Sequence, residues 1–382
     1  MTKNPYKSIT YFKGLNTLRF IAAYLVLIHH AEQIRVKNGF EDIQWLSLFR
    51  NGDHAVTFFF VLSGFLITYL LLKENYKTKS ISIKNFYMKR VLRIWPLYFL
   101  MVIIGTLILP FCFDLFNIDY EMPYTFEQVW YYFLFFLPSL VTFFFGHHLL
   151  EPLWSIGVEE IFYLIWAPLF KFLKKYILCI LFIIISVKIA LYLCIENNII
   201  TDDLIIHLIR TLRFEAMSIG GLGAYFIFNR RKNISDLYIY KRPIQFIIYS
   251  VLLIFFLFNH NIDNTIWNSI FRIPIISSLI VNFLFLYLII GVSMIDQSII
   301  KLENKIFSYL GEISYGIYMY HMISIFTVIL FLKNILISLN PILSATIFYI
   351  LVTIVVIIIS AISKRYFEDP FLRIKKKYEK QF

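Results

Sequence analysis

Residues 54–72 read HAVTFFFVLSGFLITYLLL, an apolar run that contains no Lys, Arg, Asp or Glu. A helix needs about 20 mostly apolar residues to cross a bilayer, so this run predicts a membrane span. Other runs of similar length predict the same, and the full set of predicted spans is 15–33, 54–72, 91–113, 153–170, 176–195, 207–228, 243–259, 273–294, 310–331 and 342–363. The expected fold is an all-α, polytopic membrane bundle of about ten transmembrane helices.

Composition agrees with a chain surrounded by membrane lipids. The sequence is 59% hydrophobic and 16% charged, and a soluble domain cannot bury so much apolar surface. The formal net charge is +12, but the basic residues stand beside apolar runs, which indicates membrane topology and not nucleic-acid binding. The three cysteines (Cys112, Cys179 and Cys194) lie in apolar runs without metal-ligand spacing. We therefore expect no metal and no permanently bound cofactor.

Loop charges predict the orientation of the chain. Basic residues collect before the first span, between the second and third spans, at 171–175, at 230–242 and at 375–377, whereas the loop at 114–121 is acidic. An eleventh apolar run, 126–145, is ambiguous. If it crossed the membrane, the cluster at 171–175 would lie outside, against the positive-inside rule. We therefore expect 126–145 to be re-entrant or interfacial and both termini to be cytoplasmic. The protein would be a multi-pass protein of the cell membrane, with residues 1–382 forming one membrane-embedded domain and no appended soluble domain.

Ionisable residues inside the spans are candidates for function, because a charge at mid-membrane costs roughly 2.5–3.5 kcal/mol on insertion scales. Arg19 and His30 are eleven residues apart, which is three helical turns plus roughly 20°, so both lie on one helix face. Arg90 and Arg93 share a face on the cytoplasmic side, where two guanidinium groups suit a phosphate or pyrophosphate. A snorkelling Arg19, an interfacial His30 and a positive-inside anchor at 90–93 are the alternative interpretations.

Two adjacent carboxylates, Glu159 and Glu160, lie in an apolar helix, with Ser155 four residues before Glu159. On the predicted topology they are level with His30, and either carboxylate could orient that imidazole as a general base. Further candidates for a polar cavity wall or relay are Ser63, Trp154, Arg213, Ser314, Tyr318 and His321. For Ser63 close helix packing is an alternative, and for Arg213 a structural ion pair with Glu215.

Six motifs in order resemble the acyltransferase 3 family of integral-membrane O-acyltransferases. They are GLNTLRFIAAYLVLIHH, FFFVLSGFLI, KRVLRIWPLYF, PLWSIGVEEIFYL, LGEISYGIYMYH and RYFEDP, and together they run from residue 14 to 370. The resemblance implies transfer of an acyl group, usually acetyl, from cytoplasmic acyl-CoA to a hydroxyl of a cell-surface sugar, a lipid-linked glycan or a small acceptor.

The resemblance also implies roles for single residues. The family's R-x10-H motif falls on Arg19 and His30, with the histidine as the expected base. Its R-x-x-R motif, associated with acyl-CoA, falls on Arg90 and Arg93, and we expect Arg19 to contact the acyl donor as well. The serine–glycine motif falls on Ser63 and Gly64, and the W-S-x-x-x-E motif on Trp154, Ser155 and Glu159.

Three further expectations complete the sequence-based interpretation. The acceptor hydroxyl attacks the thioester directly or after a covalent relay, for which Ser63 and Tyr318 are candidates. The esterase-like soluble domain of some family members is absent, so a separate extracytoplasmic partner could complete the transfer. The alternative functions are an exporter of polysaccharide or lipid-linked sugar, which broken helices would favour, and a scaffold of a glycan-assembly complex.

Overall fold

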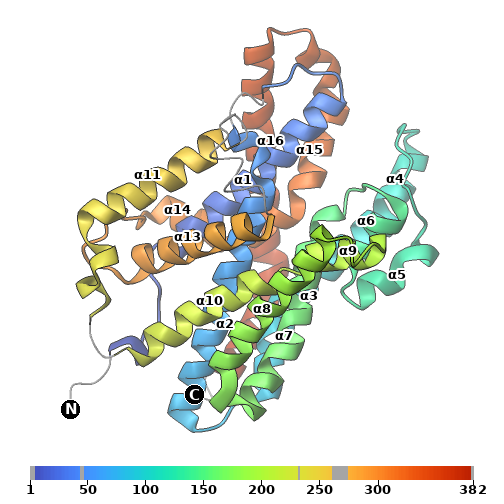
Figure 1. Cartoon of the computed structure of the whole chain (residues 1–382). Helices are drawn as coiled ribbons and strands as arrows, with labels where there is room; N and C mark the ends of the chain where they lie inside the picture. The colour runs from blue at the N-terminus through green and yellow to red at the C-terminus, as the bar shows by residue number, and fades with distance from the viewer. Residues whose placement is uncertain (1–4, 44–46, 231–232, 260–273, 380–382) are drawn as a thin grey trace.

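The computed structural model describes residues 5–43, 47–230, 233–259 and 274–379, and these contain helices and no β-strand (Figure 1). The all-α membrane bundle expected from the sequence is therefore confirmed. The α-helices are α1 (Leu15–Lys37), α2 (Gly52–Thr78), α3 (Ile83–Ile103), α4 (Leu109–Leu115), α5 (Phe126–Leu134), α6 (Pro138–Phe145), α7 (Trp154–Phe172), α8 (Ile177–Glu196), α9 (Asp203–Thr211), α10 (Phe214–Asn229), α11 (Arg242–Phe258), α13 (Pro274–Met294), α14 (Lys305–Glu312), α15 (Ser314–Ile337), α16 (Pro341–Ser363) and α17 (Asp369–Glu379).

Seven helical segments of the described chain are long and apolar enough to cross a membrane, so the predicted count of about ten is not confirmed. They are built on α2, α3–α4, α7, α8, α13, α15 and α16. Helix α1 is long enough but carries Arg19, His29 and His30 within its length, and α11 has only 17 residues. Of the three predicted spans outside this set, 15–33 is less apolar because α1 lines the polar interior, 243–259 forms only the short α11, and 207–228 is broken.

The predicted span 207–228 is wrong as one continuous helix. The chain breaks at Leu212 and Arg213, which separate α9 from α10. The ammonium group of Lys188, on α8, donates hydrogen bonds to the carbonyl oxygens of Ile209 and Leu212, at the end of α9. The break is stable inside the bundle because Lys188 satisfies carbonyl groups that a continuous helix would bond internally.

The predicted span 310–331 is shifted along the chain. Helix α14 ends at Glu312, and the spanning helix α15 begins only at Ser314. The Ser314 hydroxyl donates to the carbonyl oxygen of Gly311, which satisfies a backbone group freed by the break.

The ambiguous run 126–145 folds as two short helices. Helices α5 and α6 have nine and eight residues, and Phe136 between them has a φ of 59°. Neither helix is long enough to cross a bilayer. This geometry agrees with a non-spanning segment, while its depth in the membrane stays a prediction.

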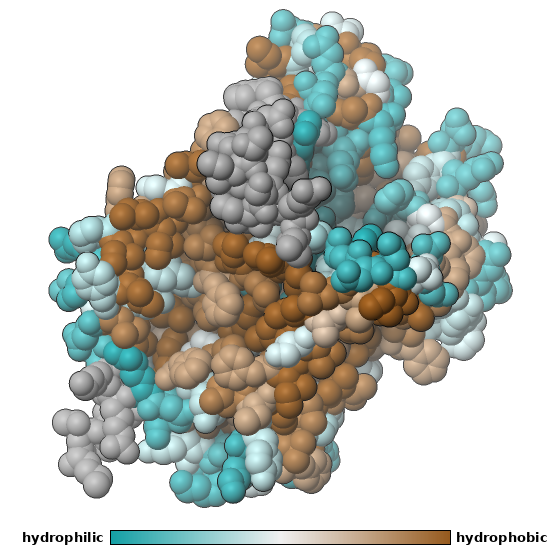
Figure 2. Space-filling model, in the orientation of Figure 1, coloured by the Kyte–Doolittle hydropathy of each residue, from teal (hydrophilic) through white to brown (hydrophobic). Residues whose placement is uncertain are grey.

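Helix α2 is the central helix of the bundle and packs against α1, α7, α10 and α13. Its contact with α10 is close because Gly64 and Gly220 carry no side chain. A Cβ at Gly64 would lie 1.9 Å from the carbonyl oxygen of Met217, and one at Gly220 would lie 2.0 Å from that of Val61. Figure 2 shows a broad apolar face over α8, α10, α11 and α13, as expected for a surface covered by lipid. Several polar side chains of α1, α2, α3, α7 and α15 instead line cavities inside the bundle.

Candidate functional site

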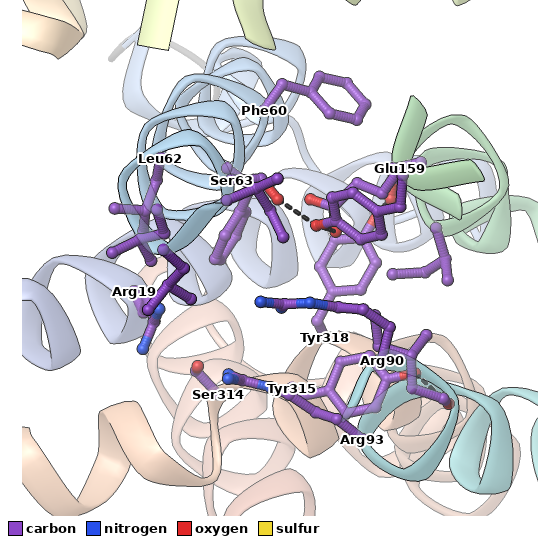
Figure 3. Close-up of a pocket in the computed structure, with 18 of the residues that line it drawn as sticks. Arg19, Phe60, Leu62, Ser63, Arg90, Arg93, Glu159, Ser314, Tyr315 and Tyr318 are labelled. Atoms are coloured by element: carbon purple, nitrogen blue, oxygen red, sulfur yellow. Dashed lines mark hydrogen bonds between the residues drawn. The ribbon is translucent and has the colours of Figure 1, made fainter. Parts of the chain in front are cut away.

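A cavity of about 300 Å³, here called the inner cavity, lies between α1, α2, α3, α7 and α15. Arg19 reaches it from α1, Ser63 from α2, and Arg90 and Arg93 from α3 (Figure 3). Its other polar lining residues include Ser155, Glu159, Tyr163, Ser314, Tyr315 and Tyr318. The structure thus brings the three predicted donor-binding arginines into one space, although they come from helices separated by about 70 residues in sequence.

The arginines give the inner cavity an excess of positive charge. Arg90 lies against the ring of Tyr163, with the guanidinium carbon 5.5 Å from the ring centroid, and its buried Nε has no hydrogen-bond partner among the described residues. Arg19 donates to Asn16 Oδ1 at 3.2 Å. Arg93 is exposed at the edge of the cavity. Three guanidinium groups against one lining carboxylate, Glu159, make a site suited to an anion with several oxygens.

The two carboxylates of α7 belong to the inner cavity and its wall. Tyr163, one turn after Glu159, donates its hydroxyl to Glu159 Oε2 at 2.8 Å and also contacts Ser63 Oγ. Glu160 accepts a hydrogen bond from Trp95 Nε1 at 2.8 Å. The expected pairing of either carboxylate with His30 is wrong, because their partners lie on α3 and α7, toward the arginines.

His30 borders a second and larger space, here called the outer cavity, of about 920 Å³. The other polar side chains that line it include His29, Gln33, Asp53, His147, His148, Glu151 and Lys333. The His30 ring lies 5.3 Å from the ring of His321 and 5.2 Å from that of His29, measured between centroids. No carboxylate hydrogen bond to His30 is present in the described residues. A neutral imidazole beside a wide polar cavity can accept a proton from a bound hydroxyl group.

Tyr318 lines both cavities and separates them. Its hydroxyl donates to the carbonyl oxygen of Pro152 at 2.9 Å and lies 2.7 Å from Ser155 Oγ. Trp154 lines the outer cavity beside it and packs its ring edge-on against Phe60. Of the predicted wall residues, Tyr318 lines both cavities, Ser63, Ser155 and Ser314 line the inner one, and Trp154 lines the outer one.

Arg213 does not join this site. It stands at the break between α9 and α10, next to the ion pair of Lys188 with Glu215 at 3.5 Å. Sequence reasoning missed Tyr163 and Glu151. Tyr163 lies four residues after Glu159 on α7, a spacing that places both on one helix face, whereas Glu151 pairs with His147 of the loop before α7, where helix spacing gives no signal.

Comparison with known proteins agrees with this geometry. A family model described as an acyltransferase domain, acyltransferase 3, matches residues 12–362. The chain belongs to this family. Its arginine-lined and histidine-lined cavities are built from the helices that carry the motifs quoted above.

Relatives of known name extend beyond this chain. The O-acetyltransferase OatA of Staphylococcus aureus (strain NCTC 8325 / PS 47) is 27% identical over 389 residues, covering 97% of this chain and 58% of the relative. A putative O-acetyltransferase of Staphylococcus aureus (strain COL) is 26% identical and covers 96% of this chain and 58% of the relative. This chain therefore spans little more than half the length of these relatives. No solved structure matches it.

Proposed function

We propose that the protein transfers an acyl group, acetyl in the first instance, from cytoplasmic acyl-CoA to a hydroxyl of a cell-surface or lipid-linked sugar. The observation that carries this proposal is the pair of cavities that meet at Tyr318, one lined by arginines and the other by His30. The named relatives, which are O-acetyltransferases, support acetyl as the group that is moved.

The inner cavity suits the donor. Acyl-CoA carries a pyrophosphate and a 3′-phosphate, and Arg90 and Arg93 offer forked donors that match phosphate oxygens. A cavity of about 300 Å³ is at the small end of ligand pockets, so it holds the slender acyl-pantetheine arm and leaves the nucleotide outside, past the exposed Arg93. The thioester then lies near Tyr318 and Ser63.

The outer cavity suits the acceptor. His30 accepts the proton of the acceptor hydroxyl as the oxygen attacks the thioester carbonyl. A carbon–oxygen bond forms, the carbon–sulfur bond breaks, and the thiolate of coenzyme A leaves and takes up a proton. Because Tyr318 stands between the cavities, its side chain moves aside for direct attack, or a hydroxyl such as Ser63 carries the acyl group in between.

The donor site is tested with purified protein in lipid nanodiscs and acetyl-CoA as the probe. Arg90→Ala with Arg93→Ala removes charge-assisted hydrogen bonds worth roughly 1.5–3 kcal/mol each, so acetyl-CoA binding weakens about 10²-fold or more. Arg373→Ala, on the exposed surface of α17, is the matched control and leaves binding unchanged. Unchanged binding in the double variant would refute the donor site.

The base is tested by release of free thiol from acetyl-CoA in the presence of chitotetraose as a trial acceptor. His30→Ala lowers kcat by about 10²-fold or more, the usual contribution of a general base, while acetyl-CoA binding stays intact. Activity near that of the wild type with normal expression would exclude this role.

An exporter of polysaccharide or lipid-linked sugar is the second candidate, because α9–α10 and α14–α15 are broken helices, a feature of many transporters. Thiol release separates the two functions: an exporter moves its cargo without consuming acetyl-CoA, whereas a transferase releases one thiol for each ester formed.

A further inference from the structure

We propose that His321, on α15, is a positioning residue that holds His30 toward the outer cavity and keeps the pair of rings to a single proton. The inference rests on the proposed function, because it concerns the base of that reaction. His321 is not itself part of the cavity lining, but its neighbours Tyr318 and Met322 are. His321 therefore lies behind the residues that line the outer cavity.

The ring of His321 supports the ring of His30 by stacking. The two centroids are 5.3 Å apart and the planes are inclined by 30°. His321 is 1% exposed, so its own position is fixed by the surrounding helices, whereas His30 is only partly buried and faces the cavity. A base held on one side by a rigid aromatic surface keeps the orientation that proton transfer requires.

The hydrogen bonds of His321 favour its neutral form. Nδ1 donates to the carbonyl oxygen of Tyr318, which fixes the tautomer and leaves a lone pair on Nε2. Nε2 is buried and has no partner among the described residues. A proton on Nε2 would therefore create a buried donor without an acceptor, which is costly in free energy.

Charge reinforces this preference. The titratable groups nearest the pair are His29 from α1, Asp53 from α2 and Tyr318 from α15 itself. Those elsewhere around the outer cavity are Lys37, Asp119, Tyr120, His147, His148, Glu151 and Lys333. Two imidazolium rings in stacking contact would repel each other at low dielectric. A proton on His321 thus prevents His30 from accepting the proton of the acceptor, and the active state is the one in which His321 is neutral.

The test compares three variants by thiol release from acetyl-CoA with chitotetraose, over a range of pH. His321→Ala removes the supporting ring and lowers kcat by about tenfold or more, with KM for acetyl-CoA within about twofold of the wild type. His321→Phe restores the ring and most of kcat, but cannot be protonated, so the acid limb of its pH profile moves to lower pH. His207→Phe is the matched control, because His207 also pairs its ring with an aromatic side chain, at 5.0 Å from Phe143, outside both cavities.

The outcomes separate the two proposals. If the wild type releases no thiol, the proposed function fails. If the wild type is active and His321→Ala has the same kcat, the role of His321 is overturned. It is also overturned if His321→Phe loses as much kcat as His321→Ala and the acid limb of its pH profile does not move. Should His321→Ala fail to give monodisperse protein, the pH profile of His321→Phe alone decides, since an unmoved limb contradicts the proposal.

Discussion

The histidines around the outer cavity differ in their ability to act as a base, because each has different hydrogen-bond partners. His148 lies in the loop before α7 and is 3% exposed. Its Nδ1 accepts from the backbone N–H of Leu150 at 3.1 Å, and its Nε2 lies 3.3 Å from Thr142 Oγ1. Burial lowers the pKa of His148 to about 3, and the positive field of neighbouring His147 contributes. His148 is therefore a structural residue that ties α6 to the loop, not a second base.

This depressed pKa predicts local loosening in acid. The unfolded loop binds a proton on His148 below about pH 6.5, whereas the folded loop does not until about pH 3. The stabilisation is complete above pH 6.5 and is lost progressively as the pH falls toward 3. Hydrogen exchange of residues 138–150, corrected for the intrinsic pH effect, should be faster at pH 5 than at pH 7. His148→Phe should abolish this difference, and His147→Gln, at an exposed ring, should retain it.

At the scale of helices, the sequence predicted which segments are apolar better than where they break. The runs at 54–72 and 342–363 became α2 and α16 because no Lys, Arg, Asp, Glu, Gly-rich turn or proline break interrupts them. The break between α9 and α10 could not be predicted, since it depends on Lys188, which is distant in sequence and supplies the missing hydrogen bonds. The wrong pairing of Glu159 with His30 has the same origin. The spacing of four residues between Glu159 and Tyr163 can be read from the sequence, but the rotation of α7 that turns both side chains toward the arginines cannot.

The packing of α2 on α10 predicts a strong response to a small change. A Cβ at position 220 would lie only 2.0 Å from the carbonyl oxygen of Val61. Gly220→Val adds this Cβ and two methyl groups, so α2 and α10 must move apart. Overpacking typically costs 1–3 kcal/mol, and a backbone clash lies at the upper end. The apparent Tm in detergent, followed by the loss of monodisperse protein on heating, should fall clearly. Phe226→Leu, on the exposed side of α10, is the control and should melt like the wild type.

At the scale of the whole molecule, the orientation predicted from loop charge places the arginine-lined cavity toward the cytoplasm. The inner cavity is lined by Thr10, Leu70 and Arg93, close to the basic loops expected in the cytoplasm, and the outer cavity by Lys37, Asn38 and Asn334, at the opposite ends of α1 and α15. The motifs of the sequence name several residues that line these cavities, among them Arg19, Arg90 and His30, but they missed Tyr163 and Glu151. They did not reveal that the carboxylates of α7 serve the inner cavity, because sequence spacing gives a helix face but not its neighbours.

This orientation predicts which exposed positions react with a membrane-impermeant thiol reagent in intact cells. In a chain with Cys112, Cys179 and Cys194 replaced by Ala, Ser338→Cys, between α15 and α16, should be labelled from outside. Lys175→Cys, between α7 and α8, should be labelled only after the membrane is permeabilised. Lys175→Cys tests the topology more directly, because residue 175 would lie outside the cell if 126–145 crossed the bilayer. Labelling of Lys175→Cys in intact cells would show that α7 has the opposite orientation. The arginine-lined cavity would then be out of reach of cytoplasmic acyl-CoA.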